Sequence, residues 1–375
     1  MRPTRAEINL KFLKDNVRAL KSLHGDREFF CPMVKADAYG HGDVQVATAL
    51  ANDGIDRFGV ILVEEGMKLR KNNIKQDILV FGYFDKESLD ESFAHQLIPV
   101  IGSLESLPHL PKDRKVRIHI KFDSGMSRMG FQQHEAPQVL EFLNAHKNIE
   151  LEGVCTHFLN GDDSNQIESW TLQQMKVFSE MEKKFKGMFK YSHCRNSGAL
   201  ISDFQGTEGY HQDKNFLGAR PGIAIYGYSS TAKNYPIELR PVMSLHSVLA
   251  RVRKIKKGDV VSYGATWKAQ RDSTIATVAL GYGDGFPRNL SNNSWMLFRG
   301  ERVPVIGRIC MDYLMVDLTD VRADKPIQSG EQITAWGYQG ATLLSAEDLA
   351  KKMNSISYEL VTGLTSRVPR VYVGD

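Results

Sequence analysis

The sequence has few cysteines and no long apolar run. Its 375 residues include only four cysteines, and no two of them form a CxxC pair: Cys31, Cys155, Cys194 and Cys310. This spacing argues against a zinc site and a disulfide framework, so we expect buried, reduced thiols and no bound metal. No apolar stretch approaches the roughly 18 residues that a membrane span needs. Because the charged opening segment also lacks the apolar centre of a secretory signal, we expect a cytoplasmic protein with no membrane partner.

The sequence also lacks an excess of charge of one sign. Lys and Arg number 48 against 44 Asp and Glu, a formal net charge of +4. The most basic run, Arg251–Asp259, is typical of a strand with Val252 and Ile255 inward and its cations in solvent. We favour that interpretation over a nucleic-acid patch, so no nucleic-acid partner is expected.

Strand-like and helix-like segments alternate from Phe29 to Tyr226. The apolar, β-rich stretches are Phe29–Val34, Phe58–Val63, Ile78–Gly82, Ile98–Ile101, Val116–Phe122, Leu151–His157, Tyr191–Cys194 and Gly218–Tyr226. Helical spacing lies between most of them, as in Asp43–Asn52, Glu64–Asn72, Glu135–Ala145 and Trp170–Phe185. About eight strand–helix units are typical of a (β/α)8 TIM-type barrel. An open doubly wound sheet is the alternative.

The pattern changes after about Pro236. Helical spacing nearly vanishes, and Val/Ile/Thr-rich runs alternate with Gly and Asp turns, with one helix expected at Ser345–Met353. The sequence therefore predicts an α/β barrel over residues 1–235 and a mostly β domain over residues 236–375. The boundary is expected within Ser229–Pro241, and the strand-like residues 1–10 are candidates for either domain.

Polar residues close several of the predicted barrel strands, where barrel enzymes carry their working side chains. These strand-end residues are Lys35, Asp123, Arg128, His157, Asn196, Ser197 and Arg220. Taken one at a time, each is as well explained by an ion pair or a turn. Their motifs are more specific: VKADAYGHG (34–42), KFDSGMSRMGF (121–131), THF (156–158), RNSGA (195–199), ARPGIAIYG (219–227), SYGATW (262–267), ALGYGDGFPR (279–288) and GRICMDYLMVD (307–317).

In this order, and over nearly the whole chain, these motifs resemble those of the alanine racemase family. The resemblance implies a barrel followed by a β domain, pyridoxal phosphate as cofactor, and the interconversion of L- and D-alanine for peptidoglycan. It implies that Lys35 carries the cofactor as an imine and that Arg220 holds the ring nitrogen unprotonated, since a guanidinium only donates hydrogen bonds. The other cofactor contacts implied are Tyr39, His157, Asn196, Ser197, Gly222 and Ile223.

Inverting a stereocentre requires a proton to leave one face of Cα and another to arrive on the opposite face. By the resemblance, Lys35 serves one face and Tyr263 the other. Arg128 and the backbone of Met311 are the implied contacts of the substrate carboxylate. Supporting residues are Lys121, which is often carbamylated in the family, Asp312, and Tyr282 at the substrate entrance. The family's head-to-tail homodimer would bring Tyr263 of one chain over the barrel of the other.

Other functions remain open at this stage. Ser366 stands where many members have a tyrosine before RVPR, which predicts a wider entrance and racemisation of serine beside alanine. A decarboxylase of the same plan would favour a carboxylate, not Arg220, at the cofactor ring. A non-enzymatic single-barrel protein would lack the second domain. The GYGDGF segment (281–286) is a weak match to a dinucleotide loop, because no helix is predicted after it.

Overall fold

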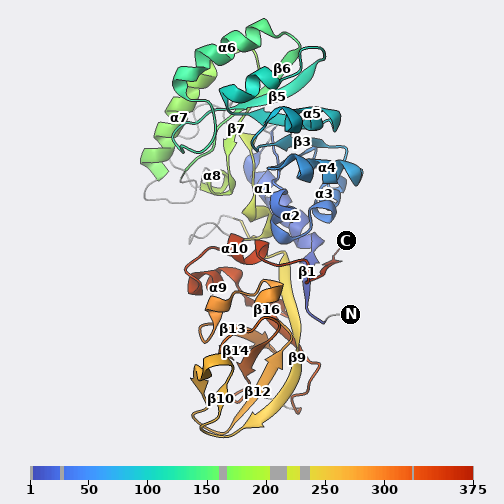
Figure 1. The fold of residues 1–375 in the computed structure, drawn as a ribbon, viewed down its shortest axis with the longest axis vertical. Coiled ribbons are helices and arrows are strands. Elements are labelled where there is room, and N and C mark those ends of the chain that lie inside the picture. The colour runs from blue at the N-terminus through green and yellow to red at the C-terminus, as the bar shows by residue number, and fades with distance from the viewer. Residues whose placement is uncertain are drawn as a thin grey trace.

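The molecule is elongated, with a helix-covered parallel sheet at one end and an antiparallel β region at the other (Figure 1). This computed structural model describes residues 3–25, 29–159, 167–202, 218–228, 237–322 and 325–374. The predicted boundary between residues 235 and 236 lies outside these ranges. Within them no helix combines the length and the apolar character needed to cross a membrane. All four cysteines are free, and three of them are buried.

The parallel sheet has seven strands that pair in chain order. They are β2 (Arg57–Val60), β3 (Asp77–Val80), β4 (Ile98–Ile101), β5 (Val116–Lys121), β6 (Ile149–Cys155), β7 (Tyr191–Arg195) and β8 (Gly218–Ala219). The extended segment 29–34 lies between the two edge strands and bridges Phe30 to Ala219 and Met33 to Gly59. The backbone N–H of Cys31 donates to the Ala219 carbonyl, and that of Val34 donates to the Gly59 carbonyl, each at 2.8 Å. This segment takes the eighth position, so the predicted barrel is confirmed.

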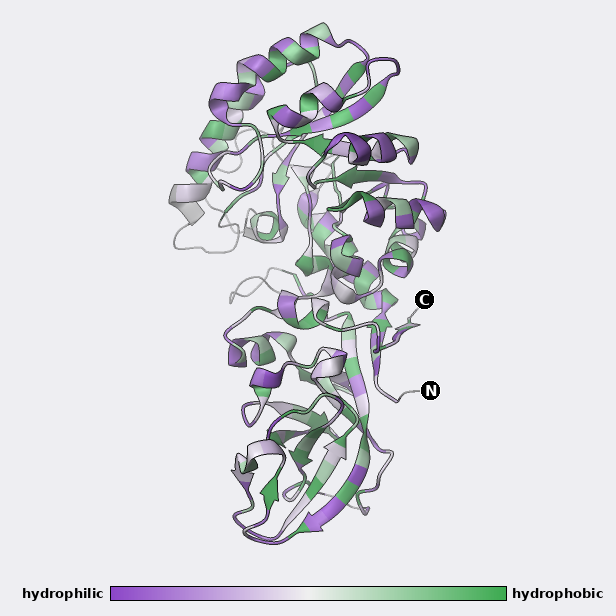
Figure 2. Cartoon of the chain, in the orientation of Figure 1, coloured by the Kyte–Doolittle hydropathy of each residue, from purple (hydrophilic) through white to green (hydrophobic). Residues whose placement is uncertain are grey.

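Helices cover the outside of this sheet, and hydrophilic and hydrophobic residues alternate along them (Figure 2). They include α1 (Leu10–His24), α3 (Asp43–Asn52), α4 (Val63–Lys71), α5 (Lys86–Ala94), α6 (Ala136–Ala145) and α7 (Ile167–Lys184). Two short helices, α2 (Lys35–Gly40) and α8 (Ser197–Ser202), follow the segment 29–34 and β7. The helix predicted at 43–52 has the observed bounds, and those predicted at 64–72, 135–145 and 170–185 overlap α4, α6 and α7. Helix α1 was not predicted, although Leu13, Val17 and Leu20 form its buried stripe.

A nine-stranded sheet forms most of the other end of the molecule. Its strands are β1 (Arg5–Asn9), β9 (Met243–Ile255), β12 (Ser273–Val278), β13 (Trp295–Phe298), β14 (Glu301–Ile306), β15 (Leu314–Asp317), β16 (Gln332–Gln339), β17 (Thr342–Leu344) and β18 (Arg370–Val373). A separate two-stranded ribbon pairs β10 (Val260–Val261) with β11 (Trp267–Lys268). The predicted helix at 345–353 is α9 (Ala346–Lys352), and α10 (Ser357–Thr362) was not predicted. Strand β1 pairs with β9 and with β18, so both ends of the chain meet in this sheet.

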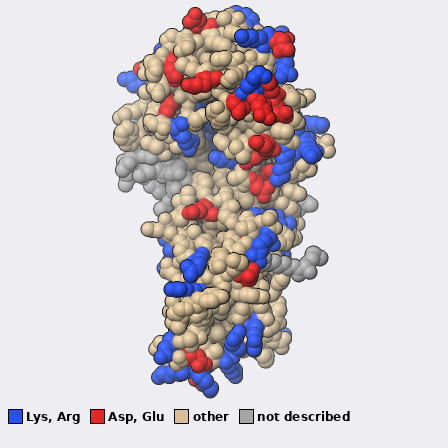
Figure 3. Space-filling view, viewed as in Figure 1, with Lys and Arg blue, Asp and Glu red and all other residues tan. Residues whose placement is uncertain are grey.

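The basic run lies on β9 as an ordinary strand. Val252 and Ile255 are half-buried, whereas Arg251, Arg253 and Lys254 are exposed. On the face drawn in Figure 3, cations are scattered among acidic side chains. The solvent-facing interpretation of this run is therefore confirmed.

Candidate active site

A cavity of about 520 Å³ opens at the carboxyl ends of the barrel strands. Ten of the residues predicted from the sequence line it together: Lys35, Tyr39, Lys121, Arg128, His157, Asn196, Ser197, Arg220, Gly222 and Ile223. They come from segments as far apart in the chain as the start of α2 and the residues after β8. The sequence therefore identified most of the wall of this cavity.

Lys35 begins a left-handed turn. Ala36, Asp37, Ala38 and Tyr39 all have φ of 52–53°, in the region that L-residues avoid. Such a conformation costs roughly 1–2 kcal/mol per residue relative to a right-handed helix, and runs of it are rare. The turn carries Lys35 and Tyr39 into the same cavity, so the backbone strain lies beside the candidate functional groups.

Glu65, near the start of α4, holds this turn from outside. Its carboxylate accepts hydrogen bonds from the backbone N–H of Ala36 at 2.6 Å, Ile61 at 2.9 Å and Leu62 at 3.0 Å. Charged acceptors make the stronger hydrogen bonds, so Glu65 fastens the strained turn to the end of β2 and the start of α4. No pattern in the sequence indicates this role of Glu65.

The surroundings of Lys35 favour its neutral amine. Burial lowers the pKa of Lys35, and the nearby charge of Arg128 lowers it further, while Glu65 opposes the shift. A neutral amine can attack a carbonyl carbon, whereas an ammonium cannot. Lys35 is therefore suited to form an imine.

Hydroxyl and backbone groups gather at one side of the cavity. Ser197 starts α8, and its Oγ accepts from the backbone N–H of Gly222 at 2.9 Å and of Ala224 at 3.4 Å. The hydroxyl of Tyr39 lies so close to Gly222 that an added Cβ would stand 2.4 Å from it. Ile223 begins a short 3-10 helix, whose first N–H groups have no partner within the helix. Burial raises the pKa of Tyr39, which keeps its hydroxyl as a donor. This set of donors fits a phosphate group.

Both terminal nitrogens of the Arg220 guanidinium donate to neighbouring protein groups. One terminal nitrogen donates to His193 Nδ1 at 2.5 Å and to the His193 carbonyl at 2.7 Å. The other donates to the Thr156 carbonyl at 2.6 Å and lies 3.5 Å from His157 Nδ1. In the described part of the chain Nε has no partner, so it is the donor left for a group in the cavity. Burial lowers the pKa values of His157 and His193 well below normal, and the charge of Arg220 lowers them further, so both neighbouring imidazoles are neutral.

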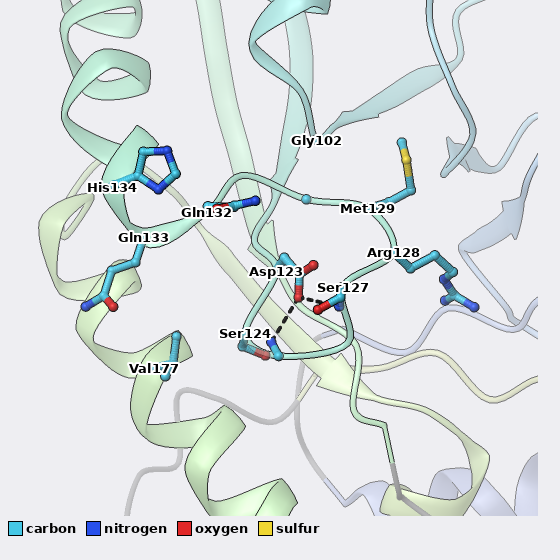
Figure 4. Close-up of a pocket in the computed structure, with 12 residues that line it drawn as sticks. Gly102, Asp123, Ser124, Ser127, Arg128, Met129, Gln132, Gln133, His134 and Val177 are labelled. Carbon is cyan, nitrogen blue, oxygen red and sulfur yellow. Dashed lines mark hydrogen bonds between the residues drawn. The ribbon is translucent and has the colours of Figure 1, made fainter.

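Lys121 and Arg128 bring further positive charge to the mouth of the cavity. Burial lowers the pKa of Lys121, and the charges of Arg220 and Arg128 contribute. Arg128 also borders a neighbouring hollow of about 870 Å³, beside the turn that Asp123 holds through the backbone N–H groups of residues 125–127. In Figure 4 the Arg128 guanidinium lies on the opposite side of this loop from Gln133 and His134. Within the described residues the Arg128 guanidinium forms no ion pair. Its charge is therefore available to an incoming carboxylate.

Four predicted residues do not line this cavity, because they lie in the β region: Tyr263, Tyr282, Met311 and Asp312. Tyr282 and Met311 lie on neighbouring loops, since the backbone N–H of Tyr282 donates to the Cys310 carbonyl at 3.0 Å, and that of Gly283 to the Met311 carbonyl at 2.8 Å. Ser262, beside Tyr263, donates to the Arg308 carbonyl at 2.6 Å and brings its loop to the same region. Their side chains are unusually open to solvent for their kind: Tyr263 is 71% exposed and Met311 53%. Tyr313, 49% exposed, joins them.

Ser366 is exposed and, like Tyr263 and Met311, lies outside the described lining of this cavity. Its neighbours Thr365 and Arg367 donate to the Gly283 carbonyl and to Asp312, so Ser366 lies beside the loops of the β region and the wider entrance stays a prediction. Tyr358 of α10 lines the cavity, with its ring centroid 5.9 Å from that of Tyr39. Sequence reasoning missed Tyr358, and it also missed His193, whose imidazole bonds Arg220.

Two family models match the chain. Residues 8–230 match the model described as alanine racemase, N-terminal domain, and residues 242–372 match alanine racemase, C-terminal domain. The chain belongs to the alanine racemase family. An alanine racemase of Caldanaerobacter subterraneus subsp. tengcongensis is 34% identical over 100% of this chain and 95% of its own length.

Solved structures of family members agree with this fold. Alanine racemase from Clostridium difficile 630 aligns with a TM-score of 0.89 and 33% identity, covering 100% of this chain and 96% of that one. Alanine racemase from Bacillus anthracis, solved with bound L-Ala-P, aligns with a TM-score of 0.88 and 31% identity over 100% of this chain and 96% of that one. The family consists of isomerases that act on an amino acid.

Proposed function

We propose that this chain is a pyridoxal-phosphate-dependent racemase that interconverts L- and D-alanine. The observation that carries the proposal is the single cavity in which Lys35, the donor set around Ser197 and Gly222, and Arg220 Nε meet. These groups match the three parts of the cofactor, which are an aldehyde, a phosphate and a pyridine ring. When bound, the cofactor supplies an electron-withdrawing ring that lowers the barrier to losing the Cα proton.

The protein's own groups then have separate tasks. Tyr39, Asn196 and Ser197, with the backbone of Gly222 and Ile223, would hold the phosphate, and Asn196 also caps α8 by accepting from Ala199 N–H at 2.9 Å. Arg220 would donate to the ring nitrogen and, as a permanent cation, would leave no proton there. Arg220 would thereby favour return of a proton to Cα.

Two bases are required for inversion, and we assign them to Lys35 and Tyr263. Lys35 holds or takes the proton on one face of Cα, helped by its lowered pKa. Tyr263 of the partner chain would act on the other face. His157, which lies 3.5 Å from Arg220, would bond this tyrosine in the proposed dimer. Arg128 and the Met311 backbone receive the substrate carboxylate, with Asp312 and Tyr282 supporting the Met311 loop.

Lys121 is proposed to carry a carbamate. The reaction joins its neutral amine to carbon dioxide and releases a proton, which turns a neutral group into an anion near Arg128 and Arg220. The lowered pKa of Lys121 and the two neighbouring guanidinium groups favour that change. An anion there would orient Arg128 for the substrate.

The active site is proposed to be shared between two chains of a homodimer. Tyr263 and Met311 are exposed on the β region, whereas Lys35 lies in the cavity of the barrel. A head-to-tail pair would place the β region of one chain over the barrel of its partner and make two equivalent composite sites. Exposed apolar side chains such as Met311 and Tyr313 are what such a contact covers.

The alternative activities differ in what they need at the ring nitrogen. A decarboxylase gains from a protonated ring held by a carboxylate, and Arg220 occupies that place here. A direct test incubates the purified protein with pyridoxal phosphate and L-alanine and measures D-alanine by chiral chromatography. Borohydride reduction and peptide mapping should label Lys35. Carbon dioxide release without racemisation, or label on another lysine, would overturn the proposal.

A further inference from the structure

A chain of hydrogen bonds crosses the barrel interior from Arg220 to the far end of the sheet. Arg220 donates to His193 Nδ1 at 2.5 Å, and His193 Nε2 lies 2.8 Å from His119 Nδ1. His119 Nε2 lies 3.3 Å from a carboxylate oxygen of Glu152. Glu152 then accepts from Arg117 at 2.9 Å, and Arg117 donates to Asp77 at 2.8 Å. Strands β3, β5, β6 and β7 all contribute to this path.

The groups at the two ends of this path, Arg220 and Glu152, determine which ring nitrogen of each histidine carries its proton. A guanidinium only donates, so His193 Nδ1 must be an acceptor, and neutral His193 carries its proton on Nε2. That proton points to His119 Nδ1, which leaves the His119 proton on Nε2, facing Glu152. A carboxylate only accepts, so the direction is consistent at the far end as well. Both histidines are buried, and burial lowers both pKa values, so each has one proton to place.

The barrel is locally adapted to hold this path. The pairing of β5 with β6 shifts register between Ile118 and His119, and that of β7 with β8 shifts between His193 and Arg195. Gly153 on β6 leaves the space that the His119 ring occupies, since an added Cβ would stand 2.3 Å from that ring. Phe29 stacks on His193 with centroids 4.1 Å apart and planes 11° apart. These features fix both imidazoles in place.

Glu152 is the anion that gives the path its direction. Burial alone would raise the pKa of this carboxyl, but its hydrogen bond with His119 and the charge of Arg117 lower the pKa instead. Without an anion at this position His119 can turn its proton toward His193. His193 would then carry its own proton on Nδ1, against the donors of Arg220.

We propose that Glu152 is a positioning residue for Arg220, acting through His119 and His193 so that the guanidinium keeps Nε directed into the cavity. Its effect on catalysis rests on the proposed function, whereas the orientation of the two histidines does not. The Glu152 carboxylate faces Arg117 near the start of β5, whereas Lys35 follows the end of the segment 29–34. Among the described residues the side-chain partners of Glu152 are Arg117 and His119, and neither lines the cavity. Glu152 would therefore affect the reaction without contacting the cavity, through the two buried histidines.

The test starts from protein labelled with ¹⁵N-histidine and free of cofactor. Long-range ¹H–¹⁵N spectra report which ring nitrogen is protonated, and His119→Gln and His193→Gln assign the signals. In the unsubstituted protein both residues should show a proton on Nε2. In Glu152→Gln, whose amide can donate, the protons of both should move wholly or partly to Nδ1. Glu150→Gln is the matched control, since Glu150 is exposed on the same strand without a bond or ion pair in the described residues.

Activity supplies the second measurement. With cofactor bound, Glu152→Gln should lower kcat for alanine by about tenfold or more, the range typical of residues that orient a functional group. Glu150→Gln should stay within about twofold, inside the ±0.5 kcal/mol expected of surface changes. A proton on His193 Nδ1 in the unsubstituted protein, or unchanged protons in Glu152→Gln, would overturn the hydrogen-bond path whether or not the protein is a racemase. Shifted protons with unchanged kcat would overturn the positioning role.

Discussion

Gly153 on β6 lies against the imidazole of His119 on β5, so closely that a Cβ at residue 153 would stand 2.3 Å from two of the ring atoms. Gly153→Ala should therefore push His119 away from His193 and lower the free energy of unfolding by about 1–3 kcal/mol, the usual cost of overpacking a core. Urea denaturation measures this. In a His119→Ala background the same substitution should cost almost nothing, because the ring that it strikes is gone. An equal cost in both backgrounds would show that His119 is not the cause.

Mixed dimers test whether two chains share each site. Lys35→Ala and Tyr263→Phe should each be nearly inactive alone. In a heterodimer of the two, both changes fall in one composite site and the other site is intact, so about half of the normal activity should return. The measurement is racemisation by heterodimers purified with two affinity tags. If each chain built its own complete site, the heterodimer would stay inactive.

The left-handed turn after Lys35 predicts an unusual response to glycine. Ala36 is exposed and has φ of 52°, so Ala36→Gly should raise the free energy of unfolding by about 1 kcal/mol through relief of backbone strain. Ala49 is the matched control, since it lies in the right-handed helix α3. There the same change should lower stability by about 1 kcal/mol. Thermal unfolding of both variants compares the signs, and equal signs would contradict a strained turn.

Buried histidines should make the protein sensitive to acid. Burial lowers the pKa of five of them: His41 and His246, each to about 4, and His119, His157 and His193. Unfolded histidine titrates near 6.5, so below that pH the unfolded chain binds protons that the folded chain does not. As the pH decreases below 6.5, the free energy of unfolding should therefore decrease by about 1.4 kcal/mol per pH unit for each histidine.

His246 allows this acid sensitivity to be checked away from the cavity, because it bonds Thr334 inside the β region. His246→Gln should reduce the loss of stability between pH 7 and pH 5 by about 2 kcal/mol. Urea denaturation at the two pH values gives the difference. An undiminished loss would mean that His246 does not contribute.

Tyr358 and Ser366 make different predictions for substrate range. Tyr358→Ala enlarges the cavity and should raise the ratio of serine to alanine racemisation, because a pocket rejects an added hydroxyl only weakly, by about 100-fold. Ser366→Tyr should lower that ratio, because residue 366 lies beside the loops of Gly283 and Asp312, which the proposed homodimer places over the cavity. Kinetics with both amino acids measure the ratio. An unchanged ratio in Ser366→Tyr would contradict the wider entrance predicted from the sequence.

Hydrophobic patterns within single segments of the sequence predicted most of the strands and helices. The alternating segments predicted the barrel strands, and polar residues at strand ends predicted six of the residues that line the cavity, including Lys35 and Arg220. The family resemblance added Tyr39, Lys121, Gly222 and Ile223. Phe29–Val34 was expected as a full strand but joins its neighbours only through isolated bridges, because such pairing depends on two segments far away in the chain. The left-handed turn was not predicted either, since Ala36 and Ala38 have no preference for that conformation.

The inner polar path was hidden for a similar reason. In the sequence VRIHIK, His119 reads as one more residue of an apolar strand, and Glu152 reads as a solvated carboxylate between Leu151 and Gly153. Only the register shift and the missing side chain at Gly153 bring them together. Tyr358 was missed because α10 is six residues long, too short for a periodic signal.

The place of β1 has a consequence for how the chain is made. Arg5–Asn9 is synthesised before both of its partners, β9 and β18, and residues 10–369 separate it from β18. Until both partners have been synthesised, this strand has at least one unpaired edge, which is the state most open to association with other chains. The barrel helices can form as they emerge, but β1 is enclosed on both sides only after β18 has emerged. The synthesis of β18 therefore completes this sheet.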